Sequence, residues 1–234
     1  MPYKEYRQLL VFDTGRTKYK QTWEIQKRLV EYKKKDILPD CLIVAEHYPV
    51  ITMGRGASYK NLLVTSDELQ RKGIELFEIE RGGDITFHGP GQTVLYPVVD
   101  LNNRRRDTHR YLRDLENFAI KALSELGLRA GVKRGMTGIW VQNEKIGAIG
   151  VAVSGWITYH GIAINISTDL NYFKLIVPCG IPECRVSSLA EILGRNINMD
   201  DINQVLINAF AEYFNYRIES CKDPEQLPSY RTLT

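Results

Sequence analysis

Residues 145–166, KIGAIGVAVSGWITYHGIAINI, form the stretch that decides the fold. Segments 145–153 and 158–166 are rich in β-branched and small apolar residues, and a turn at Gly155 separates them; this pattern is typical of two consecutive strands. A strand at 138–142 precedes them across an Asn143–Glu144 turn, which predicts a hairpin. The recurring small residues leave room for an extended alkyl chain on the sheet face, although glycines also mark bulges or close strand packing.

The segments on either side mix helices and strands without a regular βαβ repeat. The other predicted strands are 7–13, closed by Thr14–Gly15, 41–46, 49–52 as a continuation of the same sheet, 74–79 and 93–99. The predicted helices are 18–35, 66–73, 107–127 with Asp107 as N-cap, a short one from Ser187–Ser188 to Gly194, and a last one capped by Asp200. This mixture favours an α+β fold, a mixed β-sheet with flanking helices, over a doubly wound sheet. We expect residues 1–234 to form a single domain whose polar tail lies on the surface.

The composition is that of an ordinary globular protein and argues against several classes of function. The 234 residues are 44% apolar and 25% charged, with a formal net charge of +3, which is too small to indicate nucleic-acid binding. No apolar run approaches the roughly 18 residues of a membrane helix. The first seven residues resemble neither an export signal nor a transit peptide. We therefore expect a cytoplasmic protein that binds neither nucleic acid nor a membrane.

The four cysteines are scattered and predict neither a disulfide framework nor a zinc site. Cys179 and Cys184 are the only close pair, no CxxC occurs, and the histidines lack ligand spacing. The sequence also lacks a P-loop, a GxGxxG after a strand, HExxH and GxSxG, the motifs of common nucleotide, zinc-protease and serine-hydrolase sites. Neither a metal nor a cofactor is expected.

Residues 81–92, RGGDITFHGPGQ, do not fit an ordinary strand, helix or turn. Four glycines and a proline surround His88, and such a backbone can approach a ligand closely with N–H groups pointing at it. A histidine that is hydrogen-bonded within a turn fits the same residues. The segment is therefore a candidate ligand-binding loop.

Residues 178–182, PCGIP, hold a cysteine in a rigid loop between two prolines. A nucleophile must be held in place without being packed into a core strand, and this loop meets that requirement. A tight turn needs the same residue types. Lys145, directly after a hairpin turn, fits an exposed and idle side chain when it is considered alone.

Together these segments resemble the octanoyltransferase family of lipoate biosynthesis, the lipoyl(octanoyl) transferases. The motifs RGGDITFHGPGQ, KIGAIG, TYHGIAIN and PCGI occur in the family's order. Residues 52–55 resemble its TxGR element, and the resemblance extends from about Thr52 to Gly194. Two departures are visible. Phe87 stands where the family usually has tyrosine, and Gly147 stands where it usually has alanine. Neither departure removes a reacting group.

The resemblance implies both a fold and a reaction. The fold is that of the biotin and lipoate protein ligase catalytic domain. The reaction moves an octanoyl group from octanoyl-acyl carrier protein to a lysine of lipoyl domains, those of 2-oxoacid dehydrogenase complexes and the glycine cleavage H protein, with Cys179 as nucleophile and Lys145 as its partner. The segments matched to substrate binding, with His160 added for positioning, are Arg81, Gly82, Gly83, Asp84, Ile85, Thr86, Phe87, His88, Ala148, Ile149, Gly150, His160, Gly161, Ile162 and Ala163.

The chemistry explains why a cysteine and a lysine would be paired. A thiolate attacks a thioester readily, and exchange between two sulfurs is nearly balanced, so an acyl-enzyme can form without ATP. A free cysteine with a pKa of about 8.5 is mostly protonated at neutral pH, and a neighbouring ammonium raises its thiolate fraction. The lysine could then accept a proton from the acceptor amine. Backbone N–H groups near Gly180 or at Gly82–Gly83 are candidates for holding the oxyanion.

Three alternatives stay open on the sequence. An ATP-dependent lipoate or biotin protein ligase on the same fold would need a nucleotide site and would leave Cys179 without a role. A transferase with another donor or acceptor, or a non-enzymatic acyl-binding protein, fits the same motifs. Of the basic clusters 104–106 and 133–134, we expect the first to dock an acidic carrier protein.

Overall fold

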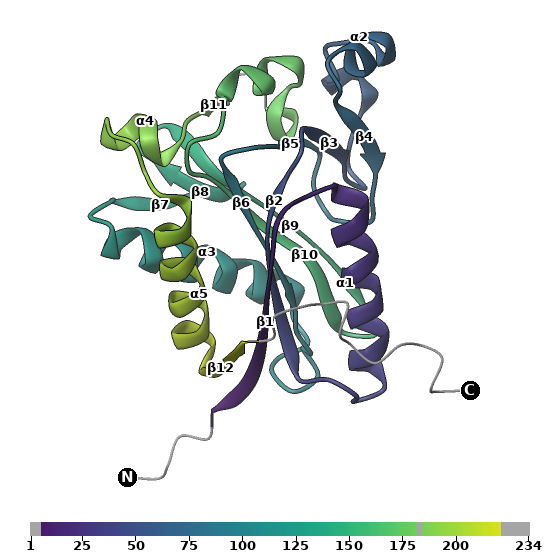
Figure 1. Ribbon diagram of the computed structural model, residues 1–234, viewed down its shortest axis with the longest axis vertical. Helices are drawn as coiled ribbons and strands as arrows, with labels where there is room; N and C mark the ends of the chain where they lie inside the picture. Colours follow the sequence, from purple (N-terminus) through teal and green to yellow (C-terminus); the bar gives the residue numbers. More distant parts are fainter. Residues whose placement is uncertain (1–5, 182–183, 221–234) are drawn as a thin grey trace.

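A nine-stranded mixed sheet forms the centre of the computed structural model, which describes residues 6–181 and 184–220 (Figure 1). Its strands are β1 (Arg7–Thr17), β2 (Asp40–His47), β6 (Gln92–Val98), β7 (Ala130–Lys133), β8 (Met136–Val141), β9 (Glu144–Ser154), β10 (Ile157–Asn165), β11 (Arg185–Val186) and β12 (Tyr216–Ser220). They follow the order β12-β1-β2-β6-β10-β9-β8-β7, and β11 pairs with β9. The β1–β2, β1–β12 and β9–β11 pairs are parallel and the others antiparallel. The predicted mixed sheet is confirmed.

A second, three-stranded sheet covers one end of the first. It consists of β3 (Val50–Met53), β4 (Glu75–Glu78) and β5 (Ile85–His88) in the order β4-β3-β5, beside the short helix α2 (Ser66–Arg71). Two predictions were wrong here. Residues 49–52 do not continue the main sheet, because the chain breaks at Pro49 and β3 pairs with β4 and β5 instead. The glycine-rich segment also contains a regular strand, β5.

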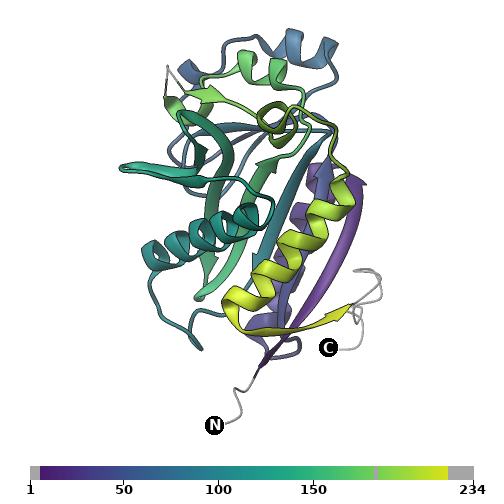
Figure 2. The same ribbon diagram turned by 90° about the vertical axis from the view of Figure 1, so that its left-hand side faces the viewer.

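Helices cover both faces of the main sheet. Helix α1 (Tyr19–Lys34) packs on one face, and α3 (Thr108–Glu125) and α5 (Met199–Phe214) pack on the other, as Figures 1 and 2 show from two sides. Phe118 of α3 and Phe210 of α5 meet edge to face, with ring centroids 5.3 Å apart. The shorter helices are the 3₁₀ turns η1 (Tyr59–Asn61), η2 (Leu170–Leu175) and η3 (Pro178–Gly180), and α4 (Leu189–Leu193).

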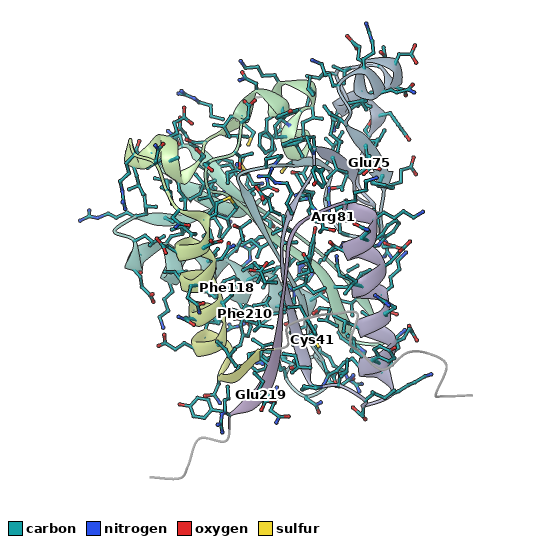
Figure 3. All side chains as sticks on the ribbon, in the orientation of Figure 1. Cys41, Glu75, Arg81, Phe118, Phe210 and Glu219 are labelled. Atoms are coloured by element: carbon teal, nitrogen blue, oxygen red, sulfur yellow. The ribbon has the colours of Figure 1, made fainter. Side chains whose placement is uncertain are left out.

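Apolar burial explains why these elements assemble. Leu29 and Val30 of α1 join Ile43 of β2 in one buried cluster, and the α3–α5 face forms a second, larger one. Figure 3 places Arg81 toward the end of the sheet that carries the small sheet, and Cys41 toward the opposite end. In the part of the chain that the structure describes, no helix combines the length and apolar character needed to cross a bilayer.

Helix boundaries follow the sequence signals with small corrections. Asp107 caps α3 by accepting the Arg110 N–H, and Ser188 caps α4. Asn198, not Asp200, caps α5, because its side chain accepts the Asp200 N–H and the helix therefore begins at Met199. The predicted N-cap was thus wrong by two residues, a normal error for a helix start.

Several strand limits also differ from the prediction. Strand β1 does not close at Thr14–Gly15 but passes through a bulge there and runs to Thr17. The hairpin turn is Gln142–Asn143, because Val141 pairs with Glu144 and Gln142 takes a φ of 52°. Strands β7 and β12 were not predicted. Pro182, Cys221 and the polar tail lie outside the described residues.

Candidate active site

Cys179 lies in a strained turn at the end of the sheet. It is at the centre of η3 with φ 58° and ψ 18°, a left-handed conformation that is uncommon for residues other than glycine. The next residue, Gly180, also has a positive φ, and a Cβ there would lie 2.4 Å from Asp84 Oδ2. Asn61 donates to the same carboxylate oxygen at 2.7 Å. Asp84 therefore packs closely against the turn that presents the half-buried sulfur.

Lys145 is hydrogen-bonded directly to that sulfur. It lies at the start of β9, is 5% exposed, and its Nζ donates to Cys179 Sγ at 3.0 Å and to the Thr137 carbonyl at 2.9 Å. Gly138 makes room for it, since a Cβ there would lie 2.5 Å from Lys145 Cε. Among the described residues, the hydrogen bonds of Lys145 Nζ go to this sulfur and this carbonyl, and the ring of Trp140 lies 5.5 Å away.

A cavity of about 360 Å³ begins at this pair and lies between the two sheets. Its volume suits a small ligand. The predicted residues that line it are Arg81, Gly83, Asp84, Ile85, Thr86, His88, Lys145, Ala148, Ile149, Gly150, His160, Gly161, Ile162, Ala163 and Cys179. Three separate motifs and the cysteine loop are thus brought together around one cavity.

Gly82 and Phe87, which were predicted to bind substrate, do not line this cavity. The ring of Phe87 is fully buried on the other side, stacked on Tyr172 with centroids 4.6 Å apart. Strand alternation explains this, because Thr86 and His88 on either side of it face the cavity. Gly82 instead ties its loop to β9 by donating its N–H to the Val151 carbonyl at 2.9 Å.

Other cavity residues were not predicted from the sequence. They are Tyr19, Val94, Tyr96, Gly135, Met136, Thr137 and Ile181. Val94 and Tyr96 are two apart on a predicted strand, so period-two alternation could have placed them on one face. Tyr19 carries no comparable signal, because it reaches the cavity only through the packing of α1 against β10.

Arg81 connects the TxGR element, residues 52–55, to the glycine-rich segment 81–92. Its buried guanidinium donates to the Thr52 carbonyl at 2.7 Å and to the Thr52 hydroxyl at 3.0 Å. The Arg55 N–H bonds back to the Arg81 carbonyl, and a Cβ on Gly54 would lie 2.4 Å from the Gly83 carbonyl oxygen. The TxGR element therefore supports the glycine-rich loop through close backbone packing.

Two of the proposed oxyanion donors are already engaged. The Gly180 N–H bonds to the Val177 carbonyl at 3.0 Å, and the Gly82 N–H bonds to Val151. A backbone donor inside such a turn is not free to stabilise a developing charge. These two N–H groups are therefore not available as oxyanion donors, whereas the Gly83 N–H and the other N–H groups near Gly180 stay predictions.

The two basic clusters lie at different ends of the sheet. Arg104 packs against the rings of Phe214 and Tyr216, and Arg106 lies over Trp156. Trp156 follows the far end of β9, roughly 30 Å along the strand from Lys145 at 3.3 Å per residue. Lys133 instead lies over Trp140, whose ring also lies near Lys145. Arg104 thus supports α5 and β12, and the cluster 104–106 lies far from Cys179.

Part of the cavity lining is polar, and we call the lining side chains Tyr19, His88, Tyr96 and His160, with the neighbouring His47, the polar floor. His47 Nε2 lies 2.7 Å from the Tyr96 hydroxyl, and His160 Nδ1 lies 3.4 Å from the Tyr19 hydroxyl. The ring of His88 is parallel to that of Tyr19, and its Nδ1 bonds to Gln92. Most of these groups are thus hydrogen-bonded although they are buried, whereas His160 Nε2 has no hydrogen-bond partner among the described residues and faces Glu80 Oε2 at 3.5 Å.

Burial keeps the polar floor uncharged at neutral pH. Desolvation lowers the pKa of His47 to about 4 and the pKa of His88 to about 3. It also lowers the pKa of His160 despite Glu80 at 3.5 Å, and it raises the phenol pKa of Tyr19 and of Tyr96. A wall of neutral rings is compatible with an apolar ligand, whereas charged imidazolium groups would not be.

The depressed histidine pKa values predict acid sensitivity. In the unfolded chain His47 and His88 bind a proton near pH 6.5, whereas in the folded chain they do so only near pH 4 or below. The stability that these two residues contribute is therefore complete above about pH 6.5 and is lost as the pH falls. When the pH falls from about 6.5 to 5, each of these histidines should lower the free energy of unfolding by roughly 2 kcal/mol. Urea unfolding at both pH values measures the loss. His88→Asn should show a smaller difference between them, and equal midpoints for the native chain would contradict the prediction.

Comparison with known proteins identifies the family. Residues 18–211 match the model of the lipoyl protein ligase A/B catalytic domain. An octanoyltransferase of Koribacter versatilis is 41% identical, covering 94% of this chain and 92% of its own length, and one of Rubrobacter xylanophilus is 46% identical over 85% and 90%.

Solved structures support the same fold. A lipoate-protein ligase A bound with ATP superposes with a TM-score of 0.73 at 18% identity, covering 95% of this chain and 92% of its own. A biotin protein ligase from Aquifex aeolicus, in complex with biotin and ATP, superposes with a TM-score of 0.52 at 16% identity over 88% and 69%. The expected ligase-type fold is confirmed. The chain therefore belongs to the family of the lipoyl protein ligase A/B catalytic domain, and within it to the octanoyltransferases.

Proposed function

We propose that the protein transfers an octanoyl group from octanoyl-acyl carrier protein to a lysine of a lipoyl domain, in 2-oxoacid dehydrogenase complexes and the glycine cleavage H protein, through a thioester on Cys179. The observation that carries the proposal is the 3.0 Å contact between Lys145 Nζ and Cys179 Sγ at one end of the cavity. The names of the relatives support the octanoyl group.

In the first half-reaction the Cys179 thiolate attacks the carbonyl carbon of the donor thioester. The C–S bond to Cys179 forms, the C–S bond to the carrier breaks, and the departing thiolate takes the proton of the Lys145 ammonium. Lys145 is then a neutral amine beside an acyl-enzyme. Because one thioester replaces another, this step needs no external energy source.

In the second half-reaction a deprotonated acceptor lysine attacks the acyl-enzyme. The C–N bond forms, the C–S bond breaks, and the neutral Lys145 accepts the proton that the new amide loses. The pair returns to thiolate and ammonium, so Lys145 acts as acid in the first step and as base in the second. General acid–base help of this kind contributes about 10²- to 10⁴-fold.

The polar floor limits the length of the acyl chain. Seven buried carbons at about 0.8 kcal/mol each give roughly 5 kcal/mol of binding, and a longer chain would push its end against hydrogen-bonded rings. We expect Tyr19→Ala to open this end and to raise the ratio of kcat/KM for a twelve-carbon donor over an eight-carbon donor by at least about tenfold. Tyr213→Ala, on the other face of the sheet, should leave the ratio unchanged. A ratio unaffected by Tyr19→Ala would mean that another group ends the cavity.

The test of the function is transfer without ATP. Purified octanoyl-acyl carrier protein and a lipoyl domain are incubated with the protein, and the lipoyl domain is weighed by mass spectrometry. We expect octanoylation of one lysine in the absence of nucleotide. Transfer that requires ATP and free octanoate, with release of AMP, would identify a ligase instead.

A further inference from the structure

One peptide group connects Lys145 to a buried carboxylate on another layer of the fold. The carbonyl oxygen of Thr137 accepts the bond from Lys145 Nζ at 2.9 Å. The N–H of the same peptide, which belongs to Gly138, donates to Glu116 Oε1 at 3.0 Å. Four groups thus lie in series: the carboxylate, the peptide, the ammonium and the sulfur of Cys179.

Glu116 is an unusual residue for its position. It lies on α3, is fully buried, and belongs to the helix face that packs against β8 and β9. Its other oxygen pairs with Arg113, whose side chain is half exposed. Glutamate is almost never fully buried without such partners, and an apolar residue here would pack equally well while leaving the Gly138 N–H unpaired.

We propose that Glu116 is a positioning residue for the Cys179–Lys145 pair, acting through the Thr137–Gly138 peptide to hold Lys145 and to favour its ammonium form beside the sulfur. Hydrogen bonds in series polarise one another. A carboxylate on the N–H side draws electron density toward the Thr137 oxygen, which then attracts the ammonium more strongly. Glu116 is nearer to Lys145 than to Cys179 along the series, so its charge favours the cation more than it opposes the thiolate.

The other charged and titratable groups around the pair reach it by other routes. Cys184 interacts with both Lys145 and Cys179, Arg81 interacts with Cys179, Lys133 interacts with Cys184, and Asp84 lies against Gly180. Arg113 faces Glu116 from the solvent side and partly offsets its charge. None of these groups bonds to the Thr137–Gly138 peptide, so a change at Glu116 can be separated from them.

The inference rests on the proposed roles of Cys179 and Lys145, but the first of its two measurements does not need acyl transfer. The rate of Cys179 alkylation by iodoacetamide, mapped to its peptide by mass spectrometry, reports the thiolate fraction from about pH 5 to pH 10. Glu116→Gln keeps an acceptor for the Gly138 N–H and removes the charge. We expect the alkylation rate near neutral pH to fall about three- to tenfold and the basic limb of the transfer pH–rate profile to move to lower pH.

Two controls make the result specific. Glu125→Gln makes the same chemical change on the exposed end of α3 and should alter neither measurement. Arg113→Met leaves Glu116 in place without its counter-charge, so it should not lower the alkylation rate. This variant keeps the proposal testable if Glu116→Gln proves too unstable to study. An unchanged alkylation rate in folded Glu116→Gln, or a fall in Arg113→Met, would overturn the proposal. Absence of transfer in the native chain would instead count against the proposed function alone.

Discussion

Replacing Cys179 by serine is expected to reduce octanoyl transfer by at least about 10⁴-fold, the loss typical of a removed nucleophile. The hydroxyl keeps the size of the side chain and its bond to Lys145, but it is far less ionised than a thiol and a poorer leaving group in the second step. Initial rates of ATP-free transfer to a lipoyl domain measure the loss. The thermal unfolding midpoint should change little, because the residue lies in a loop and outside the buried clusters.

Cys184 provides the matched control for this substitution. It is half-buried in the same loop region but does not line the cavity, and burial raises its thiol pKa. Cys184→Ser should therefore keep transfer within about twofold of the native rate. If Cys179→Ser retained more than a few per cent of the activity while Cys184→Ser lost it, the nucleophile would have been assigned to the wrong cysteine.

Replacing Lys145 by methionine is expected to lower transfer by about 10²- to 10⁴-fold. Methionine fills a similar volume in the space that Gly138 leaves, so the cavity should keep its shape while the charge and the titratable amine are lost. Both half-reactions should slow, because the amine acts as acid in one and as base in the other. Single-turnover rates of acylation and of transfer from isolated acyl-enzyme measure the two effects separately.

Chemical rescue separates loss of chemistry from loss of structure at this position. Lys145→Ala leaves a space beside the sulfur into which a small primary amine can diffuse, so methylamine should restore part of the activity with a pH dependence that follows the added amine. Lys145→Met, with its space filled, should not be rescued. A loss smaller than tenfold in either variant would count against the assigned role.

Motifs that each form a short continuous segment of the sequence predicted most of the residues that line the cavity. We expected residues 81–88, 148–150 and 160–163 to surround one ligand, and nearly all of them line the cavity. The exceptions follow from strand geometry that a motif does not contain: Phe87 alternates away from its neighbours, and Gly82 is used to bind β9. The α+β fold was likewise predictable, because each helix and strand carries its own local signal.

Other contacts of the site could not be predicted because tertiary packing alone forms them. His47 and Tyr96 meet only because β2 and β6 pair in a particular register, and Glu116 reaches Gly138 only because α3 crosses β8. Neither contact leaves a spacing signal in the sequence. The separate small sheet escaped prediction for the same reason, since its strands are short and pair with segments distant in the chain.

The most direct test of the account is the mass of the intact protein after incubation with octanoyl-acyl carrier protein, without acceptor and without ATP. We expect a gain equal to one octanoyl group, removed by hydroxylamine, retained in Cys184→Ser and absent in Cys179→Ala. Acyl transfer to a lipoyl domain with no acylated intermediate at Cys179, under conditions where the donor is consumed, would contradict the thioester mechanism.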